Sequence, residues 1–178
     1  VYKRQPNSRL RQPEDLELIR NSWQIVEQAL AQSLPIFQHG HFSLHDLVKP
    51  EAEPTQLVLF SNLFWRWSWP YSDAVFAYHW QMIALAKVEG QSETEYNQQG
   101  ELWLQEIMNL ASEPELISDL VEVAQEQRQM MLTVALLERA AAALLIDAFA
   151  YTDENQPLAE VMVERMRSEA RRLIDRLQ

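Results

Sequence analysis

One stretch of the chain limits the possible folds more than any other, because it runs from residue 113 to about residue 150 and contains no glycine or proline after Pro114. Ser112 and Glu115 have the spacing of a capping box, which indicates that a helix begins here. The second half of the stretch, residues 130–146, is apolar on nearly every side of such a helix. We therefore expect a long helix that other elements cover all round.

A membrane span is the alternative interpretation of this stretch. Three charged residues, Glu138, Arg139 and Asp147, interrupt its apolar part. Each would cost roughly 2.5–3.5 kcal/mol at the centre of a bilayer, whereas a buried helix can place such residues at its ends or edges. The sequence therefore predicts the central helix of a bundle and no transmembrane segment.

The rest of the chain also has the apolar spacing and the start and stop signals of helices. Five further segments are expected to be helical: residues 13–34, 54–70, 72–90, 92–111 and 157–178. None of them shows the sustained valine- and isoleucine-rich alternation of strands. We therefore predict an all-α fold, an antiparallel bundle of about six helices with one long buried central helix.

Short local patterns mark where these helices begin. A proline followed by two acids at 13–15 predicts the start of the first helix. A stripe of apolar residues follows it: Leu16, Ile19, Trp23, Val26 and Leu30. Ser92 and Glu95 form a second capping box. Ser43 and Asp46 have the same spacing, so we expect a short helix after Ser43 within an otherwise irregular stretch.

Composition excludes several classes of function. The 178 residues include no cysteine and only three glycines, which argues against disulfide scaffolds, cysteine-ligated metals, thiol nucleophiles and glycine-rich phosphate loops. The net charge is −11, and residues 13–159 carry six basic against 22 acidic residues, a net of −16. Such a body repels phosphate backbones and anionic lipid surfaces, so we predict no nucleic-acid partner.

The first residues need a separate interpretation. They read VYKRQ, the in-frame translation of the transposase sequencing adapter GTGTATAAGAGACAG. We therefore interpret residues 1–12 as an adapter remnant with a disordered lead-in, and residues 13–178 as a single helical-bundle domain. A native start and a lost upstream domain both stay open. Because no signal peptide follows the adapter match, we expect a cytoplasmic protein.

The candidate metal ligands are three histidines close together in the sequence. His39, His41 and His45 lie in the irregular stretch beside acidic residues and are weak candidates for a metal site. His79 lies among aromatic residues and is expected to be a core histidine. The familiar motifs of zinc hydrolases, di-iron bundles, serine hydrolases and phosphate-binding loops are absent. We therefore predict no metal, no cofactor and no enzymatic activity.

The segment from 64 to 71 is the most unusual, because aromatic residues make up most of it. On a helix, Trp65 and Trp67 would lie about 200° apart, so one apolar stripe cannot bury both. Either neighbours cover both faces, or one tryptophan is exposed where a ligand or partner binds. We predict a binding role and nominate five residues for it: Trp65, Trp67, Trp69, Tyr71 and Trp80.

An apolar pocket between helices is the alternative place for binding. Aromatic side chains together with Met82, Met108, Met130 and Met131 could line such a pocket. We therefore predict either a protein partner or a small apolar ligand. Self-association into a homo-oligomer is a further expectation.

Residues 101–150 resemble phasin-type proteins of polyhydroxyalkanoate granules. The similarity lies in the segment LASEPEL at 110–116, which leads into a long helix rich in glutamine, glutamate and alanine. The resemblance implies a protein that partitions onto polyester granules or oil droplets.

Two other resemblances concern the fold. Residues 18–23, LIRNSW, resemble the opening helix of globins, but no histidine follows His79, so heme binding is not expected. An all-α domain with a pocket is similar to the ligand-binding half of one-component repressors, although no helix-turn-helix is present. We therefore predict a non-enzymatic binding or adaptor protein, with a phasin-like granule protein and a truncated helical regulator as alternatives.

Overall fold

Five helices and four short strands make up the part of the chain that the computed structural model describes, which is residues 12–33, 35–43, 46–52, 55–59, 65–85, 88, 90–112, 125–146 and 156–178. The helices are α1 (Pro13–Leu30), α2 (Ser72–Leu85), α3 (Glu93–Ser112), α4 (Gln125–Ile146) and α5 (Gln156–Leu177). The strands are β1 (Ile36–Gln38), β2 (Leu47–Val48), β3 (Val58–Leu59) and β4 (Arg66–Ser68).

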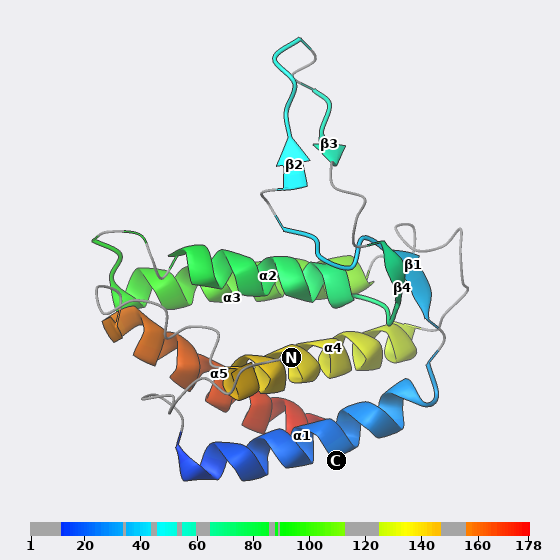
Figure 1. Ribbon diagram of the computed structural model, residues 1–178, viewed down its shortest axis with the longest axis vertical. Coiled ribbons are helices and arrows are strands. Elements are labelled where there is room, and N and C mark those ends of the chain that lie inside the picture. The colour runs from blue at the N-terminus through cyan, green and yellow to red at the C-terminus, as the bar shows by residue number, and fades with distance from the viewer. Residues whose placement is uncertain are drawn as a thin grey trace.

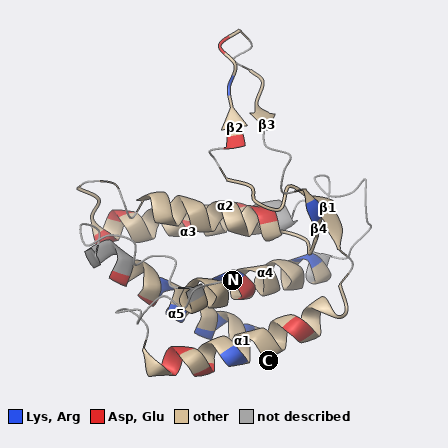
Figure 2. Ribbon diagram, in the orientation of Figure 1, with Lys and Arg blue, Asp and Glu red and all other residues tan. Residues whose placement is uncertain are grey.

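Helix α4 is the centre of the fold, as its sequence predicts. It packs against each of the other four helices. Figure 1 shows α2 and α3 on one side of it, and α1 and α5 on the other. Side chains at 131–137 and 140–144 are all buried, while Glu138 and Arg139 lie at a partly covered edge. Accordingly, α4 is mostly uncharged in Figure 2.

The membrane interpretation finds no support in the described part of the chain. No helix within it is both long enough and apolar enough to span a bilayer. The surroundings of α4 explain why an apolar segment occurs without such a span: its apolar side chains join one core cluster that includes residues of all five helices.

The local signals for helix starts are largely confirmed. The backbone N–H of Ser92 donates to Glu95 Oε2 at 3.1 Å, and that of Glu95 donates back to Ser92 Oγ at 3.3 Å, so the capping box opens α3. Ser43 N–H and Oγ–H both donate to Asp46 Oδ2, at 2.8 and 2.9 Å. Asp46 lies in a short 3-10 helical turn after Ser43, as expected, and β2 follows it directly. The predicted capping box at 112–115 lies partly outside the described residues.

Helix α1 begins at residue 13 as predicted but ends at Leu30. Its apolar stripe is also offset from the expected one, because Leu16 is exposed whereas Asp15 and Ser22 are buried. The Oγ–H of Ser22 donates to the carbonyl of Leu18 at 2.7 Å, which satisfies the buried hydroxyl. The burial of Asp15 has a different cause, which is an ion pair with α5.

That ion pair joins the first and last helices. The guanidinium of Arg167 donates through Nε to Asp15 Oδ1 at 2.7 Å and through Nη2 to Oδ2 at 3.0 Å, a two-bond geometry. The side chains of Asp15 and Arg167 are only 1% and 5% exposed. Two further bonds belong to the site, because Gln12 N–H donates to Asp15 Oδ2 and Arg167 Nη1 to Glu164 Oε2.

The prediction of a helix at 54–70 is wrong, and with it the expectation of about six helices. Residues 58–59 form β3 and residues 66–68 form β4. β4 pairs with β1 in an antiparallel ribbon, and β3 pairs with β2 in a second one. Tryptophan and phenylalanine favour strands as well as apolar helix faces, and the strand partner of β4 lies about 30 residues earlier in the chain, where helical spacing gives no indication of it.

The β2–β3 ribbon forms an arm that projects from the helical body (Figure 1). Four of its apolar side chains are exposed: Val48, Leu57, Val58 and Leu59. A two-stranded ribbon is at best marginally stable by itself. The exposed side chains of the arm therefore form an apolar area outside the helical core.

Candidate functional site

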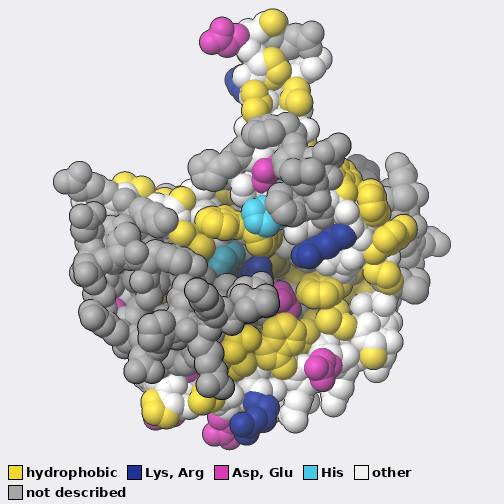
Figure 3. All heavy atoms as spheres, in the orientation of Figure 1, with side chains coloured by type: hydrophobic (Ala, Val, Ile, Leu, Met, Phe, Trp, Pro, Cys, Tyr) yellow, Lys and Arg dark blue, Asp and Glu magenta, His cyan; other side chains and the backbone are white. Residues whose placement is uncertain are grey.

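The β1–β4 ribbon carries three exposed aromatic side chains, Phe37, Trp65 and Trp67, which we call the aromatic surface. Phe37 lies directly opposite Trp67 in the strand register. Its ring centroid is 5.4 Å from that of Trp65 and 5.6 Å from that of Trp67. The exposed fractions are 53%, 43% and 68%. Figure 3 shows hydrophobic side chains gathered around this ribbon and along the arm.

The geometric reason for this exposure differs from the predicted one. In an extended strand, side chains two residues apart lie on the same face. Trp65 and Trp67 therefore share one face, where helical geometry would have put them on opposite ones. The intervening Arg66 alternates to the other face. The tryptophans are brought together by the strand, and the sequence reasoning did not nominate Phe37 as their partner.

Polar contacts fix the ribbon to the start of α2. The side chain of Gln38 donates to the carbonyl of Trp69 at 2.5 Å and accepts from the N–H of Asp73 at 3.4 Å. The Asp73 carboxylate accepts from the N–H groups of Gly40, at 3.1 Å, and Phe42, at 3.5 Å. Gly40 has a φ of +79°, which glycine adopts without strain. The aromatic surface therefore rests on an anchored turn.

A second aromatic group lies beside the first, on the turn and α2. His41 contacts Phe76 at a ring separation of 4.5 Å and Trp80 at 6.3 Å. The guanidinium of Arg139 lies 5.5 Å from the centre of the Phe76 ring, a cation–π contact. Trp80 is partly exposed, so this group adds an exposed aromatic side chain on α2.

The other two nominated residues are part of the packing. Trp69 and Tyr71 are half-buried and contact the core. Trp69 also lines a cavity of about 80 Å³ together with Met130 and Met131. Met82 and Met108, which were expected in an apolar pocket, do not line it. Ligand pockets generally have volumes of at least about 300 Å³, so this cavity is small for an organic ligand.

The described histidines lie in different environments. His39 is buried and lies edge-on to Trp65 and Phe42, whereas His41 belongs to the second aromatic group. His45 lies outside the described residues. Among the described residues, no group of three or more histidine or acidic side chains is placed to hold a metal ion. His79 is buried as expected, and burial lowers its pKa to about 3.

A polar cleft of about 800 Å³ lies between α3 and α5 and was not predicted. Five acidic side chains line it: Glu93, Glu101, Glu160, Glu164 and Glu169. Arg165 and Arg172 also line it. Its residues come from two helices about 65 positions apart in the sequence, so no local spacing could have indicated the site.

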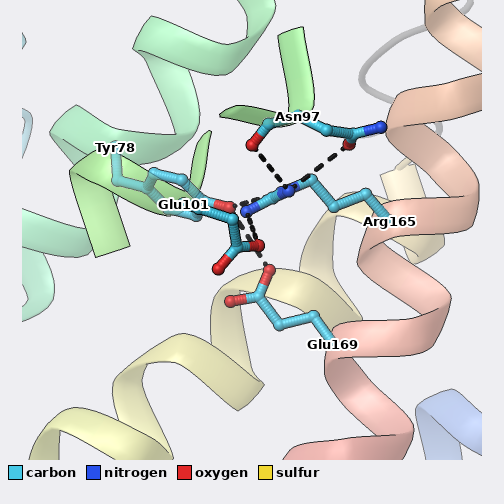
Figure 4. Close-up of polar contacts among 5 residues, drawn as sticks. All are labelled: Tyr78, Asn97, Glu101, Arg165 and Glu169. Carbon is cyan, nitrogen blue, oxygen red and sulfur yellow. Dashed lines mark hydrogen bonds and ion pairs between the residues drawn. The ribbon is translucent and has the colours of Figure 1, made fainter. Parts of the chain in front are cut away.

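Arg165 organises the inner end of this polar cleft (Figure 4). Its Nη2 donates to Glu101 Oε1 at 2.8 Å, and its Nε donates to the hydroxyl oxygen of Tyr78 at 3.0 Å. Its Nη1 donates to the side-chain oxygen of Asn97 at 3.4 Å. The Tyr78 hydroxyl in turn donates to Glu169 Oε2 at 3.4 Å. Arg165 thus reaches from α5 to both α2 and α3.

Glu169 is the unusual member of this network. It is 6% exposed, and its Oε1 has no hydrogen-bond partner among the described residues. Burial raises the pKa of Glu169 to about 7, against the opposing charges of Arg165 and Arg172. Burial also raises the pKa of Tyr78. At neutral pH the network therefore contains a carboxyl group poised between its charged and neutral forms.

Gly100 makes room for Arg165. A Cβ at Gly100 would lie 2.7 Å from the Arg165 Cζ and 2.9 Å from the Met82 Cε. Glycine weakens a helix interior by about 1 kcal/mol relative to alanine, so on α3 alone this residue is a weak point. The guanidinium of Arg165, which hydrogen bonds to Tyr78 and Glu101 hold in place, occupies the space that a larger side chain at position 100 would take.

We expect Gly100→Ala to destabilise the protein, although alanine favours helices. The methyl group would displace Arg165 from its contacts with Glu101 and Tyr78, and overpacking of this kind generally costs about 1–3 kcal/mol. Urea denaturation followed by circular dichroism measures the change. Gln98→Ala, at an exposed position of the same helix, is the control. A Gly100→Ala variant more stable than the wild type would contradict the packing argument.

Comparisons with protein-family models, curated proteins and solved structures find no match for this chain.

Proposed function

We propose that this protein is a non-enzymatic binding protein whose aromatic surface engages an apolar segment of a protein partner. The observation that carries the proposal is the exposure of Phe37, Trp65 and Trp67 side by side on one anchored ribbon. Single exposed apolar residues are ordinary, but contiguous exposed patches mark interaction sites. Tryptophan is also enriched among the residues that contribute most to binding.

The ribbon supports an extended segment as the bound element. Within the described residues, each of the two sheets contains only two strands, so an additional strand can pair along an outer edge. Strand addition obtains its affinity from main-chain hydrogen bonds and its specificity from alternate side chains. In this arrangement, the aromatic surface would receive the apolar side chains of the partner segment.

The small apolar cavity offers weaker support for the alternative of an apolar ligand, because about 80 Å³ holds little more than a few water-sized groups.

The phasin resemblance stays a prediction. The apolar side chains of α4 at 131–137 are buried in the core, so granule adsorption would depend on the aromatic surface and the arm. Failure to adsorb to polyester particles or triolein droplets would dismiss that alternative.

Selection of peptides from a random library tests the proposed function. We expect the protein to enrich peptides with aromatic and aliphatic residues at alternate positions. Trp67→Ser should lower their affinity by about 2 kcal/mol, which is roughly thirty-fold. Leu102→Ser is the matched control, because Leu102 is a similarly exposed apolar residue on α3. Equal losses for both variants, or selection of peptides without apolar residues, would contradict the proposal.

A further inference from the structure

We propose that the polar cleft between α3 and α5 binds a linear aliphatic amine that carries two or more ammonium groups. The proposal concerns a site separate from the aromatic surface and does not depend on it. Three observations support it: the volume of the cleft, the excess of carboxylates over guanidinium groups in its lining, and the oxygen of Glu169 that has no hydrogen-bond donor among the described residues.

The charge of the polar cleft favours a cation. Its five carboxylates and two guanidinium groups give a formal net charge of −3 when all are ionised. The charge of Arg165 is already engaged, because its guanidinium contacts Glu101 at 2.8 Å. The side chain of Glu164 binds Arg167 at 2.9 Å. An anionic ligand would have to approach against the remaining acids, whereas an ammonium group gains from them.

The spacing of these acids favours an organic cation over a metal ion. Glu93 and Glu101 are eight residues apart on α3, which is a distance of about 12 Å along the helix. A metal ion needs several oxygen ligands within about 2.6 Å, and no described group of acidic residues has that arrangement. Ammonium groups separated by a methylene chain can instead contact carboxylates that lie far apart, and the volume of about 800 Å³ accommodates such a chain.

Glu169 supplies the independent observation that points to a ligand. Its buried carboxyl group lines the cleft next to Arg165, and within the described part of the chain Oε1 has no donor while Oε2 accepts from Tyr78. A buried acceptor without a donor is costly. An ammonium group bound at the inner end of the cleft would supply positive charge, and a small side-chain movement would bring its N–H groups to Oε1.

Titration calorimetry with spermidine at low ionic strength tests this site. We expect binding at one site per chain, and no comparable binding of the uncharged diol 1,8-octanediol. Glu169→Gln should weaken spermidine binding about ten-fold or more, the usual range for a lost charge-assisted hydrogen bond. Glu14→Gln removes one exposed acid from α1 and should change the affinity by less than about two-fold. Equal losses in the two variants would overturn the proposal.

Two further readouts separate binding at this site from a change in folding. At pH 7, ammonium binding should release protons from Glu169, so the measured heat should depend on the ionisation enthalpy of the buffer. The charged and titratable groups that face Glu169 are Arg165, Arg172, Tyr78 and Glu101. Ser168→Trp places a large side chain in the cleft from an exposed position and should abolish binding in a folded protein. Undiminished binding of spermidine to this variant would overturn the proposal. That result would not bear on the proposed function of the aromatic surface.

Discussion

Replacing Asp15 with alanine is expected to lower the free energy of unfolding by about 3–5 kcal/mol, because it leaves the buried guanidinium of Arg167 without its principal partner. Another contact of Arg167, with Glu164, involves a carboxylate that is largely exposed. Domains of this size are generally stable by about 5–15 kcal/mol. The loss is therefore a large fraction of the total, and urea denaturation measures it.

Two further variants define the cause of this loss. Glu14→Ala removes an exposed acid from the same helical turn and should cost less than about 1 kcal/mol, the size of a helix-dipole contribution. Asp15→Leu combined with Arg167→Met removes both charges and should recover much of the stability. If Asp15→Ala cost no more than Glu14→Ala, the ion pair would not hold α1 to α5.

The same ion pair should make the protein sensitive to acid. Burial raises the pKa of Asp15, but hydrogen bonds from Arg167 and Gln12 and the charge of Arg167 outweigh it and hold the pKa below its usual value. The contribution of Asp15 to stability is therefore complete above the pKa of the unfolded chain, about 3.9. It is lost as the pH falls through the lower pKa of the folded state. The Asp15→Ala variant should lack this part of the acid transition.

Glu169→Gln is the second variant with a large expected effect, and its effect has the opposite sign. The pKa of Glu169 is about 7 in the folded protein and about 4.3 in an unfolded chain. Because the unfolded chain releases this proton first, the free energy of unfolding should fall as the pH rises from about 4.3 to about 7. Glutamine resembles the neutral acid and does not ionise. The free energy of unfolding of the variant should therefore exceed that of the wild type by up to about 3 kcal/mol at pH 8.

Thermal or urea denaturation at pH 5 and pH 8 measures this difference. At pH 5 the difference should shrink to about 1 kcal/mol, because Glu169 is neutral in the folded state while its carboxyl group in the unfolded chain is already mostly ionised. Glu101→Gln is the control, because Glu101 belongs to the same network but is largely exposed. A stability difference between wild type and Glu169→Gln that is the same at both pH values would show that Glu169 does not titrate in this range.

Much of the helical fold could be predicted because its signals are local. The capping box of Ser92 and Glu95 involves residues of a single turn and opens α3 as expected. The apolar character of residues 130–146 likewise predicts a buried helix wherever its neighbours come from. These features depend on the spacing of residues within one element, and that spacing is visible in the sequence itself.

The features that were missed all depend on contacts between distant segments. The strand at 66–68 exists because it pairs with residues 36–38, and an isolated apolar run does not distinguish that outcome from a helix. The burial of Asp15 depends on Arg167, 152 residues later in the chain. The aromatic residues of 64–71 left open whether neighbours cover them or one tryptophan is exposed. Residues 66–68 form a strand, and Phe37 joins the aromatic surface through strand pairing alone.

Solvent exposure of Trp65 and Trp67 is the property on which the proposed function most directly depends. Fluorine NMR of protein labelled with 5-fluorotryptophan measures it, with six expected resonances and assignment by Trp65→Phe and Trp67→Phe. A soluble gadolinium chelate should broaden the Trp67 resonance most strongly and that of Trp65 clearly, in line with their exposed fractions of 68% and 43%. Protection of both resonances from the chelate would contradict the existence of the aromatic surface.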